Sequence, residues 1–316
     1  MNRRVIGLVN GAIASSSYGT NPLFALPLYA AGIGVNSVLF YRYAFAVVIY
    51  ALWLTFVKKF SLKIKKEEFL PLLILALLFS FSSLTLFIAF GYIEAGIACT
   101  ILFVYPVLVA IIMAMFFKEK LTRTVLSAIV LTSIGIGLLY HGKPDATLNP
   151  LGVGIVFLSA LLYALYIVGV KKIKAVQHLK REKMSFYVMF FGLIIYIYNL
   201  KFCTQLQILD RPILWVYAIA LALLPTIISL ETINVAIKLV GSTTTAILGA
   251  LEPLTAIFFG VLLFHEHLTV RICFGVFLIL FGVFLIVTRK NTKKPKQQPL
   301  PVSSSSSDSN CLSGCF

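Results

Sequence analysis

Two stretches of this sequence, PVLVAIIMAMFFKEKLT at residues 106–122 and PLTAIFFGVLLFHEHLT at residues 253–269, repeat one pattern, P-x12-E-x-L-T. The two copies are offset by 147 residues. The residues that recur at this offset are Pro106, Glu119, Leu121, Thr122 and Gly135 in the first copy, and Pro253, Glu266, Leu268, Thr269 and Gly282 in the second. Five coincidences at a single offset are too many for chance, so the sequence predicts an internal duplication.

The composition places this duplication in a membrane. Of the 316 residues, 60% are hydrophobic and only 12% are charged, whereas soluble domains are about 45 to 50% apolar and about 25% charged. A membrane-spanning helix needs about 20 mostly apolar residues, so roughly ten spans fit in the chain. Ten spans leave no room for a soluble enzymatic domain. The fold class is therefore predicted to be all-α, a polytopic membrane protein.

Apolar runs separated by turn-forming or charged residues give the positions of these ten spans. We expect them at residues 5–30, 36–57, 69–93, 95–117, 123–140, 150–170, 184–200, 213–238, 241–264 and 270–288. Residues 291–316 differ in character, because they are rich in Pro, Ser and polar residues. Such a segment cannot bury a core and is expected to be a disordered cytoplasmic tail.

The net charge of +16 is explained by position. When the 27 basic residues are sorted by expected side, 22 lie on the side of the N-terminus, 4 lie on the other side, and Arg42 lies inside a span. The positive-inside rule then puts both termini in the cytoplasm and fits an even number of spans in the cell (inner) membrane. This charge bias is an orientation signal and not a nucleic-acid footprint.

Each copy of the duplication holds five expected spans, residues 1–145 in the first and 146–290 in the second. Because five is odd, the second copy enters the membrane from the opposite side. Ten helices arranged as two inverted five-helix repeats, with a binding site near the midplane, are an architecture of secondary transporters.

The duplicated pattern also resembles a known family. Two five-helix repeats, each with a proline in its fourth helix followed by E-x-L-T, resemble the EamA family of the drug/metabolite transporter (DMT) superfamily. Two further segments carry the resemblance, Leu251-Glu252-Pro253 and Phe40-Tyr41-Arg42-Tyr43. It extends over residues 5–288. The resemblance implies a ten-helix carrier that moves small metabolites, amino acids or drugs across a cell membrane, often outward.

Only two acidic residues, Glu231 and Glu252, lie within the apolar spans. An ionisable group at the centre of a membrane helix costs about 2.5 to 3.5 kcal/mol, so its default interpretation is functional. We expect Glu252 near the midplane and Glu231 about one helical turn nearer the cytoplasm, both able to face one cavity. Asn234 follows three residues after Glu231 on the same helix face and could orient its carboxyl. The alternative is that each carboxyl only ties helices together by hydrogen bonds.

Three tyrosines, Tyr18, Tyr105 and Tyr163, each lie ten to thirteen residues into a predicted span, which places them near the same depth. A tyrosine offers a flat apolar face with one polar tip, which suits an organic solute. Packing or a place in the interfacial aromatic belt is the alternative for each of them.

Two prolines, Pro106 and Pro253, are predicted to break their helices. Each removes a backbone donor, so the carbonyls four residues earlier, at Leu102 and Gly249, are expected to be unpaired near mid-membrane. Within a membrane such breaks persist only where they are buried in protein or line a wet cavity. A kink that serves packing alone is the alternative.

Two other features are assigned structural roles. We expect Arg42 to snorkel toward the outer end of its helix and to act as a structural tie more than as a ligand. The triplet His265-Glu266-His267 does not predict a metal site, because alternate residues at a helix end do not share a face. No cofactor is expected from the sequence.

The sequence therefore favours a secondary transporter of a small solute, such as an amino acid, a metabolite or a drug-like molecule, working by alternating access. Its partners would be the solute, the lipid bilayer, and a proton or an exchanged counter-solute. A passive channel is the alternative. A membrane-embedded lipid-modifying enzyme is less favoured, because paired carboxylates or histidine clusters at the head-group level are not found in the sequence.

Overall fold

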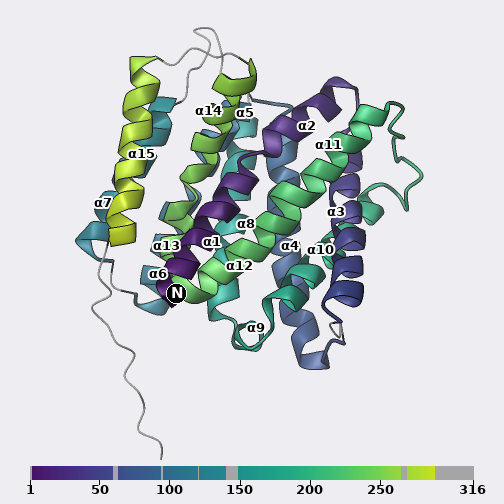
Figure 1. The fold of residues 1–316 in the computed structure, drawn as a ribbon, viewed down its shortest axis with the longest axis horizontal. Coiled ribbons are helices and arrows are strands. Elements are labelled where there is room, and N and C mark those ends of the chain that lie inside the picture. The colour runs from purple at the N-terminus through teal and green to yellow at the C-terminus, as the bar shows by residue number, and fades with distance from the viewer. Residues whose placement is uncertain are drawn as a thin grey trace, which may run out of the picture.

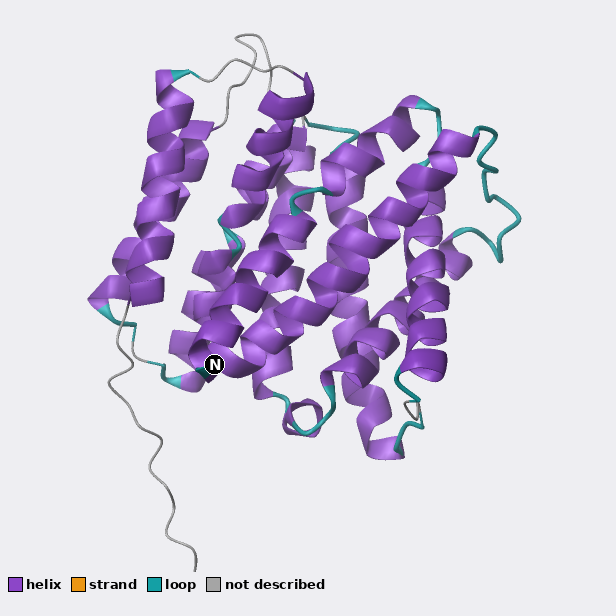
Figure 2. Ribbon diagram, in the orientation of Figure 1, coloured by secondary structure: helices purple, strands orange, loops and turns teal. Residues whose placement is uncertain are grey.

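The computed structural model describes residues 2–59, 63–93, 95–119, 121–139, 149–264 and 269–288, and within these ranges every regular element is a helix (Figure 2). The first half comprises α1 (Arg3–Tyr18), α2 (Asn21–Ala30), α3 (Val35–Leu52), the π-helix η1 (Trp53–Val57), α4 (Lys66–Ala89), α5 (Ala95–Leu102), α6 (Tyr105–Phe117) and α7 (Arg123–Leu139). The second half comprises α8 (Pro150–Lys172), α9 (Lys174–Gln177), α10 (Arg181–Asn199), α11 (Pro212–Ala222), the π-helix η2 (Leu223–Ile228), α12 (Ser229–Val240), α13 (Ser242–Leu248), α14 (Leu251–Phe264) and α15 (Val270–Thr288).

The helices lie over the apolar runs that the sequence predicts, and the ends differ by at most four residues, at Ala89 against an expected 93. Among the described residues, six helical segments are long and apolar enough to cross a membrane: Val35–Val57, Lys66–Ala89, Pro150–Lys172, Pro212–Val240, Ser242–Phe259 and Val270–Thr288. Two shorter apolar helices are Tyr105–Phe117 and Arg123–Leu138. The chain is therefore a multi-pass membrane protein. The expected tail, residues 291–316, and the His265-Glu266-His267 triplet lie outside the described residues.

The internal repeat is visible in the helix boundaries. Both α5 and α13 are short helices that end at a break, and α6 and α14 resume after it. The next helices, α7 and α15, begin at Arg123 and Val270, which are separated by the same 147 residues as the sequence pattern. Each repeat therefore contains an interrupted helix followed by an uninterrupted one.

The packing between the halves is also symmetric. The first helix of each half packs along the third span of the other half, α1 on α12 and α8 on α4. The last helices, α7 and α15, pack against each other and stand side by side at the left of Figure 1. Each half therefore completes its core with helices from the other, and neither half buries its polar centre alone.

Many large apolar side chains are exposed, and the interior contains polar groups. Large apolar side chains such as Phe56, Phe116 and Phe277 are more than half exposed, as lipid-facing residues would be. By contrast, Arg42 and Asn234 are fully buried. In water this distribution would expose large apolar patches, but in a bilayer the apolar surface faces lipid.

The N-terminus and the end of α15 lie on one face, which we call the N-terminal face (bottom of Figure 1). The guanidinium of Arg4 donates to the carbonyl oxygens of Ile286 and Val287, each at 3.2 Å. These carbonyls belong to the last turn of α15 and lack helical partners, so the contact caps the helix.

Candidate functional site

The three predicted tyrosines meet in the core. The rings of Tyr18, at the end of α1, and Tyr163, in the middle of α8, are stacked with centroids 6.2 Å apart. The ring of Tyr105, at the start of α6, meets Tyr163 edge-on with a centroid separation of 4.9 Å. All three side chains are buried. Both halves of the chain therefore contribute to one aromatic cluster, which is extended by Tyr166 stacked on Tyr163 at 6.3 Å.

Three helix breaks converge on this cluster. They separate α1 from α2, α5 from α6, and α13 from α14. Gly19, at the first break, lies directly against the backbone carbonyl of Glu252, and a Cβ there would collide with it. Gly249, at the third break, lies against the Tyr105 hydroxyl, which occupies the place of a side chain. These close approaches explain why glycine is required at both positions.

The prolines behave partly as predicted. Both interrupted helices resume next to their proline, at Tyr105 before Pro106 and at Leu251 two residues before Pro253. The expectation of an unpaired carbonyl at Gly249 is wrong, because this oxygen accepts a hydrogen bond from the backbone N–H of Glu252 at 2.9 Å. The chain tightens to an i→i+3 bond at the break, which satisfies the carbonyl locally.

Glu252 lies in the first turn of α14 and is half-buried. Its carboxylate is within electrostatic range of Tyr18, Tyr105 and Tyr163. Among the described residues it forms no ion pair. The partial positive charge at the N-terminus of α14 favours an anion at this position. The structure thus brings Glu252 and the three tyrosines together.

Glu231 belongs to a different environment from that of Glu252. One carboxylate oxygen pairs with Arg181 Nε, at the start of α10, at 2.9 Å, and the other accepts a hydrogen bond from the Tyr50 hydroxyl at 2.7 Å. Glu231 is therefore neutralised toward the N-terminal face, whereas Glu252 lies at the tyrosine cluster. A cavity that both carboxyls face stays a prediction.

Asn234 connects these two environments. Its Oδ1 accepts from the Tyr166 hydroxyl at 2.8 Å, and its Nδ2 donates to Ser185 Oγ at 3.1 Å. Ser185 is in turn within hydrogen-bonding reach of Glu231. Asn234 therefore reaches the Glu231 carboxyl through Ser185, whereas its position on the helix had suggested a direct contact.

Arg42, on α3, is a residue whose position the sequence analysis misjudged. Its side chain is fully buried and does not snorkel. Nε donates to Thr226 Oγ1 at 2.6 Å, and Nη2 donates to the Pro225 carbonyl at 3.2 Å. The guanidinium also lies over the Tyr18 ring, 5.8 Å from its centroid, in a cation–π contact. Arg42 thus joins the tyrosine cluster.

The partner of Arg42 is created by a proline inside η2. Pro225 has no N–H, so it cannot bond to the Leu221 carbonyl. The Thr226 hydroxyl donates to this carbonyl instead, at 2.9 Å. The helix widens to a π-helix here, and Arg42 donates to the same Thr226 hydroxyl and to the Pro225 carbonyl. Pro225 within an apolar span was the sequence signal for this contact.

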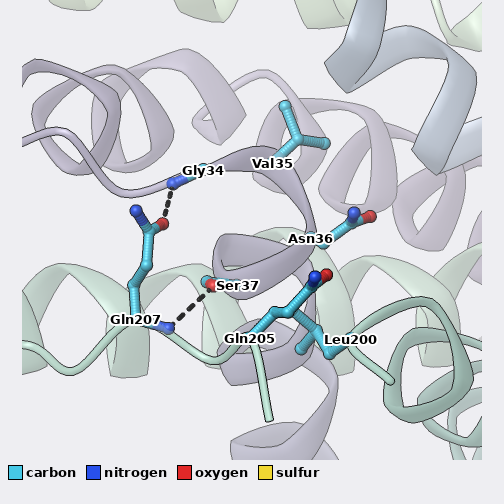
Figure 3. Close-up of a pocket in the computed structure, with 7 residues that line it drawn as sticks. All are labelled: Gly34, Val35, Asn36, Ser37, Leu200, Gln205 and Gln207. Carbon is cyan, nitrogen blue, oxygen red and sulfur yellow. Dashed lines mark hydrogen bonds between the residues drawn. The ribbon is translucent and has the colours of Figure 1, made fainter. Parts of the chain in front are cut away.

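A small pocket of about 180 Å³ lies elsewhere, on the face opposite the N-terminus. It is formed where the start of α3 meets the segment after α10, and Figure 3 shows Gln207 bridging the two. The Gln207 backbone N–H donates to Ser37 Oγ at 3.2 Å, and its side chain accepts from the Gly34 N–H. Its seven lining residues include no ionisable side chain, so we place the candidate site at the central cluster.

Within the described residues no group of His, Cys, Asp and Glu has the arrangement of a metal site. The charged and polar groups of the cluster are suited to binding an organic solute between rings and ions.

Comparison with known proteins identifies the family of the chain. The sequence matches the model of the EamA-like transporter family twice, over residues 5–141 and 150–288. The chain belongs to the EamA-like transporter family. The resemblance predicted from the duplicated pattern is thereby confirmed, and the family implies transport of small solutes across a bilayer.

A solved structure, described only as the crystal structure of a protein, has the same fold with a TM-score of 0.73 and 15% sequence identity. The likeness covers 89% of this chain and 96% of that one. No curated protein matches the sequence with significant similarity.

Proposed function

We propose that this protein is a secondary transporter of a small organic solute and that it works by alternating access. In this proposal the interrupted helices count as single spans, α1 with α2, α5 with α6 and α13 with α14. The chain then crosses the cell membrane ten times as two inverted repeats, 1–145 and 146–290, with both termini in the cytoplasm.

The convergence of three helix breaks on a cluster built from both repeats carries the proposal. A break lets the two parts of a helix move separately. The glycines at the breaks allow close contacts, Gly19 with the Glu252 carbonyl and Gly249 with the Tyr105 hydroxyl. The binding groups come from α1, α6 and α8 as well as α14, so rocking one repeat against the other would change their access.

Glu252 is the proposed coupling carboxylate. It lies at the tyrosine cluster without an ionic partner among the described residues, so a proton or a cationic group of the solute could neutralise it in turn. Glu231 is already neutralised by Arg181 and is the weaker candidate.

Counterflow in proteoliposomes tests the transporter proposal. Purified protein is reconstituted in vesicles loaded with a panel of unlabelled amines, amino acids and cationic metabolites, and uptake of each labelled compound is measured. A carrier gives saturable uptake that internal solute accelerates. A passive channel would conduct without acceleration, and conversion of lipid with no solute flux would indicate an enzyme.

Cysteine labelling tests the orientation. Lys174 is exposed in α9 on the N-terminal face, so Lys174→Cys in a variant lacking the native cysteines should react only with membrane-permeant reagents in intact cells. Reaction with an impermeant reagent added outside would reverse the assignment.

A further inference from the structure

The guanidinium of Arg42 carries a donor group that the protein leaves unused. Nε and Nη2 are bonded to η2, but Nη1 is buried and has no hydrogen-bond partner. Within the described ranges no carboxylate forms an ion pair with it. A buried charge without a counter-charge is costly, and the tie between α3 and η2 needs only Nε and Nη2.

A second unpartnered group lies close to Arg42. The Tyr29 hydroxyl, on α2, is buried without a hydrogen-bond partner and feels the charge of Arg42. The two side chains contact one ring, because the Arg42 guanidinium carbon is 5.5 Å from the Phe87 centroid and the Tyr29 ring centroid is 6.2 Å from it. Two donors without acceptors thus belong to side chains that contact the same ring, and donors of this kind form strong hydrogen bonds to anionic groups.

The surroundings of Arg42 adjoin Glu252, the carboxylate that we propose to be neutralised by a proton or by a cationic group of the solute. The Tyr18 ring lies under the Arg42 guanidinium and within electrostatic range of Glu252. The next residue, Gly19, contacts the Glu252 backbone. The side chain of Asn21, two residues further, is buried with both polar atoms unpartnered. A cation and an anion without ionic partners among the described residues therefore border one aromatic ring.

We propose that Arg42 Nη1, with the Tyr29 hydroxyl, binds a carboxylate of the transported solute. Glu252 holds the ammonium group of the same molecule, and the tyrosine rings cover its flat apolar body. The solute class is then a zwitterion, and Arg42 is a specificity-determining residue. The ammonium part of this inference rests on the proposed function, whereas the carboxylate part does not depend on Glu252.

Three rigid aromatic probes of the same shape test this inference. They are 4-(aminomethyl)benzoate, which carries both charges, 4-(aminomethyl)benzamide, which lacks the carboxylate charge, and 4-ethylbenzoate, which lacks the ammonium. Affinity is measured on the purified full chain in detergent, from the shift of its melting temperature with probe concentration.

The wild-type protein should bind the zwitterion at least about tenfold more tightly than the amide, because a hydrogen bond to a charged group contributes about 1.5 to 3 kcal/mol. In Arg42→Gln this ratio should fall to about one. Arg211→Gln is the matched control, since Arg211 is 73% exposed beside Asp210, and should keep the wild-type ratio. Arg42→Lys keeps the charge without the planar fork and should reduce the ratio.

Several results would overturn the inference. One is equal affinity of the wild type for the zwitterion and the amide, which requires no variant to fold. Another is an unchanged ratio in folded Arg42→Gln, and a third is the failure of all three probes to stabilise the wild type at millimolar concentration. Counterflow that persists without preference for carboxylates would reject this inference and leave the transporter proposal intact. Loss of counterflow for every solute, with the carboxylate preference in binding retained, would do the reverse.

Discussion

The charges at the tyrosine cluster and those at the N-terminal face are organised in opposite ways. At the N-terminal face the two less exposed acids each have a basic partner: Glu231 pairs with Arg181, and Glu68 pairs with Lys183. At the cluster, Arg42 and Glu252 lie near one ring but have no ionic partner among the described residues.

This difference shows that charge burial serves two purposes in one chain. A paired charge contributes its energy to holding helices together, and α10 is held to α12 and α4 in this way. An unpaired buried charge lowers stability and is retained where a ligand completes it. In the proposed transporter, the pairs on the N-terminal face would hold helices together on that side, and the unpaired charges at the cluster would bind the solute.

The largest effect is expected when each of the two acids within the membrane spans is replaced by glutamine in turn. Glu252→Gln should lower counterflow at least about 30-fold, because the charge at the cluster has no substitute. Glu231→Gln should lower it roughly fivefold or less, the effect of a partly exposed ion pair. Glu67→Gln, at an exposed position in the first turn of α4, is the control. Equal losses of counterflow in Glu252→Gln and Glu231→Gln, with normal melting curves, would show that the two acids do not differ in their role.

The second largest effect is expected at the close contact between Gly249 and the Tyr105 hydroxyl. Gly249→Ala should lower the melting temperature, because the new methyl group collides with the Tyr105 hydroxyl and overpacking costs about 1 to 3 kcal/mol. Tyr105→Phe in the same chain should restore part of the loss. Gly137→Ala is the control, since nothing lies within 4 Å of its Cβ position. A melting temperature unchanged in Gly249→Ala would mean that the breaks do not meet as closely as described.

The smallest effect is expected at the N-terminal face. A double-mutant cycle on Arg181→Ala and Glu231→Gln should give a coupling energy of about 0.5 to 1 kcal/mol in thermal unfolding, because the arginine side chain is half exposed. The same cycle on Arg211 and Asp210, which are 4.0 Å apart and mostly exposed, should give no measurable coupling. Coupling of equal size in both pairs would show that the Arg181–Glu231 pair does not stabilise the N-terminal face more than an exposed pair would.

The sequence by itself determined the membrane class, the helix positions and the family. These follow from composition and from the repeated P-x12-E-x-L-T pattern, because a bilayer demands long apolar helices and a duplication preserves its spacing. It also selected Glu252 and the three tyrosines, since a rare acid and aromatic residues at one depth can be recognised from linear position alone.

Only the tertiary structure decided which of these groups are neutralised. The pairing of Glu231 with Arg181 joins positions 50 residues apart, and the burial of Arg42 depends on Thr226 in the other half. The same holds for the meeting of Tyr105 with Gly249. Linear spacing reports depth and helix face but not the neighbour across a helix interface. The charge state of a buried site depends on that neighbour, because in a low-dielectric interior a partner at 3 Å outweighs every property of the segment itself.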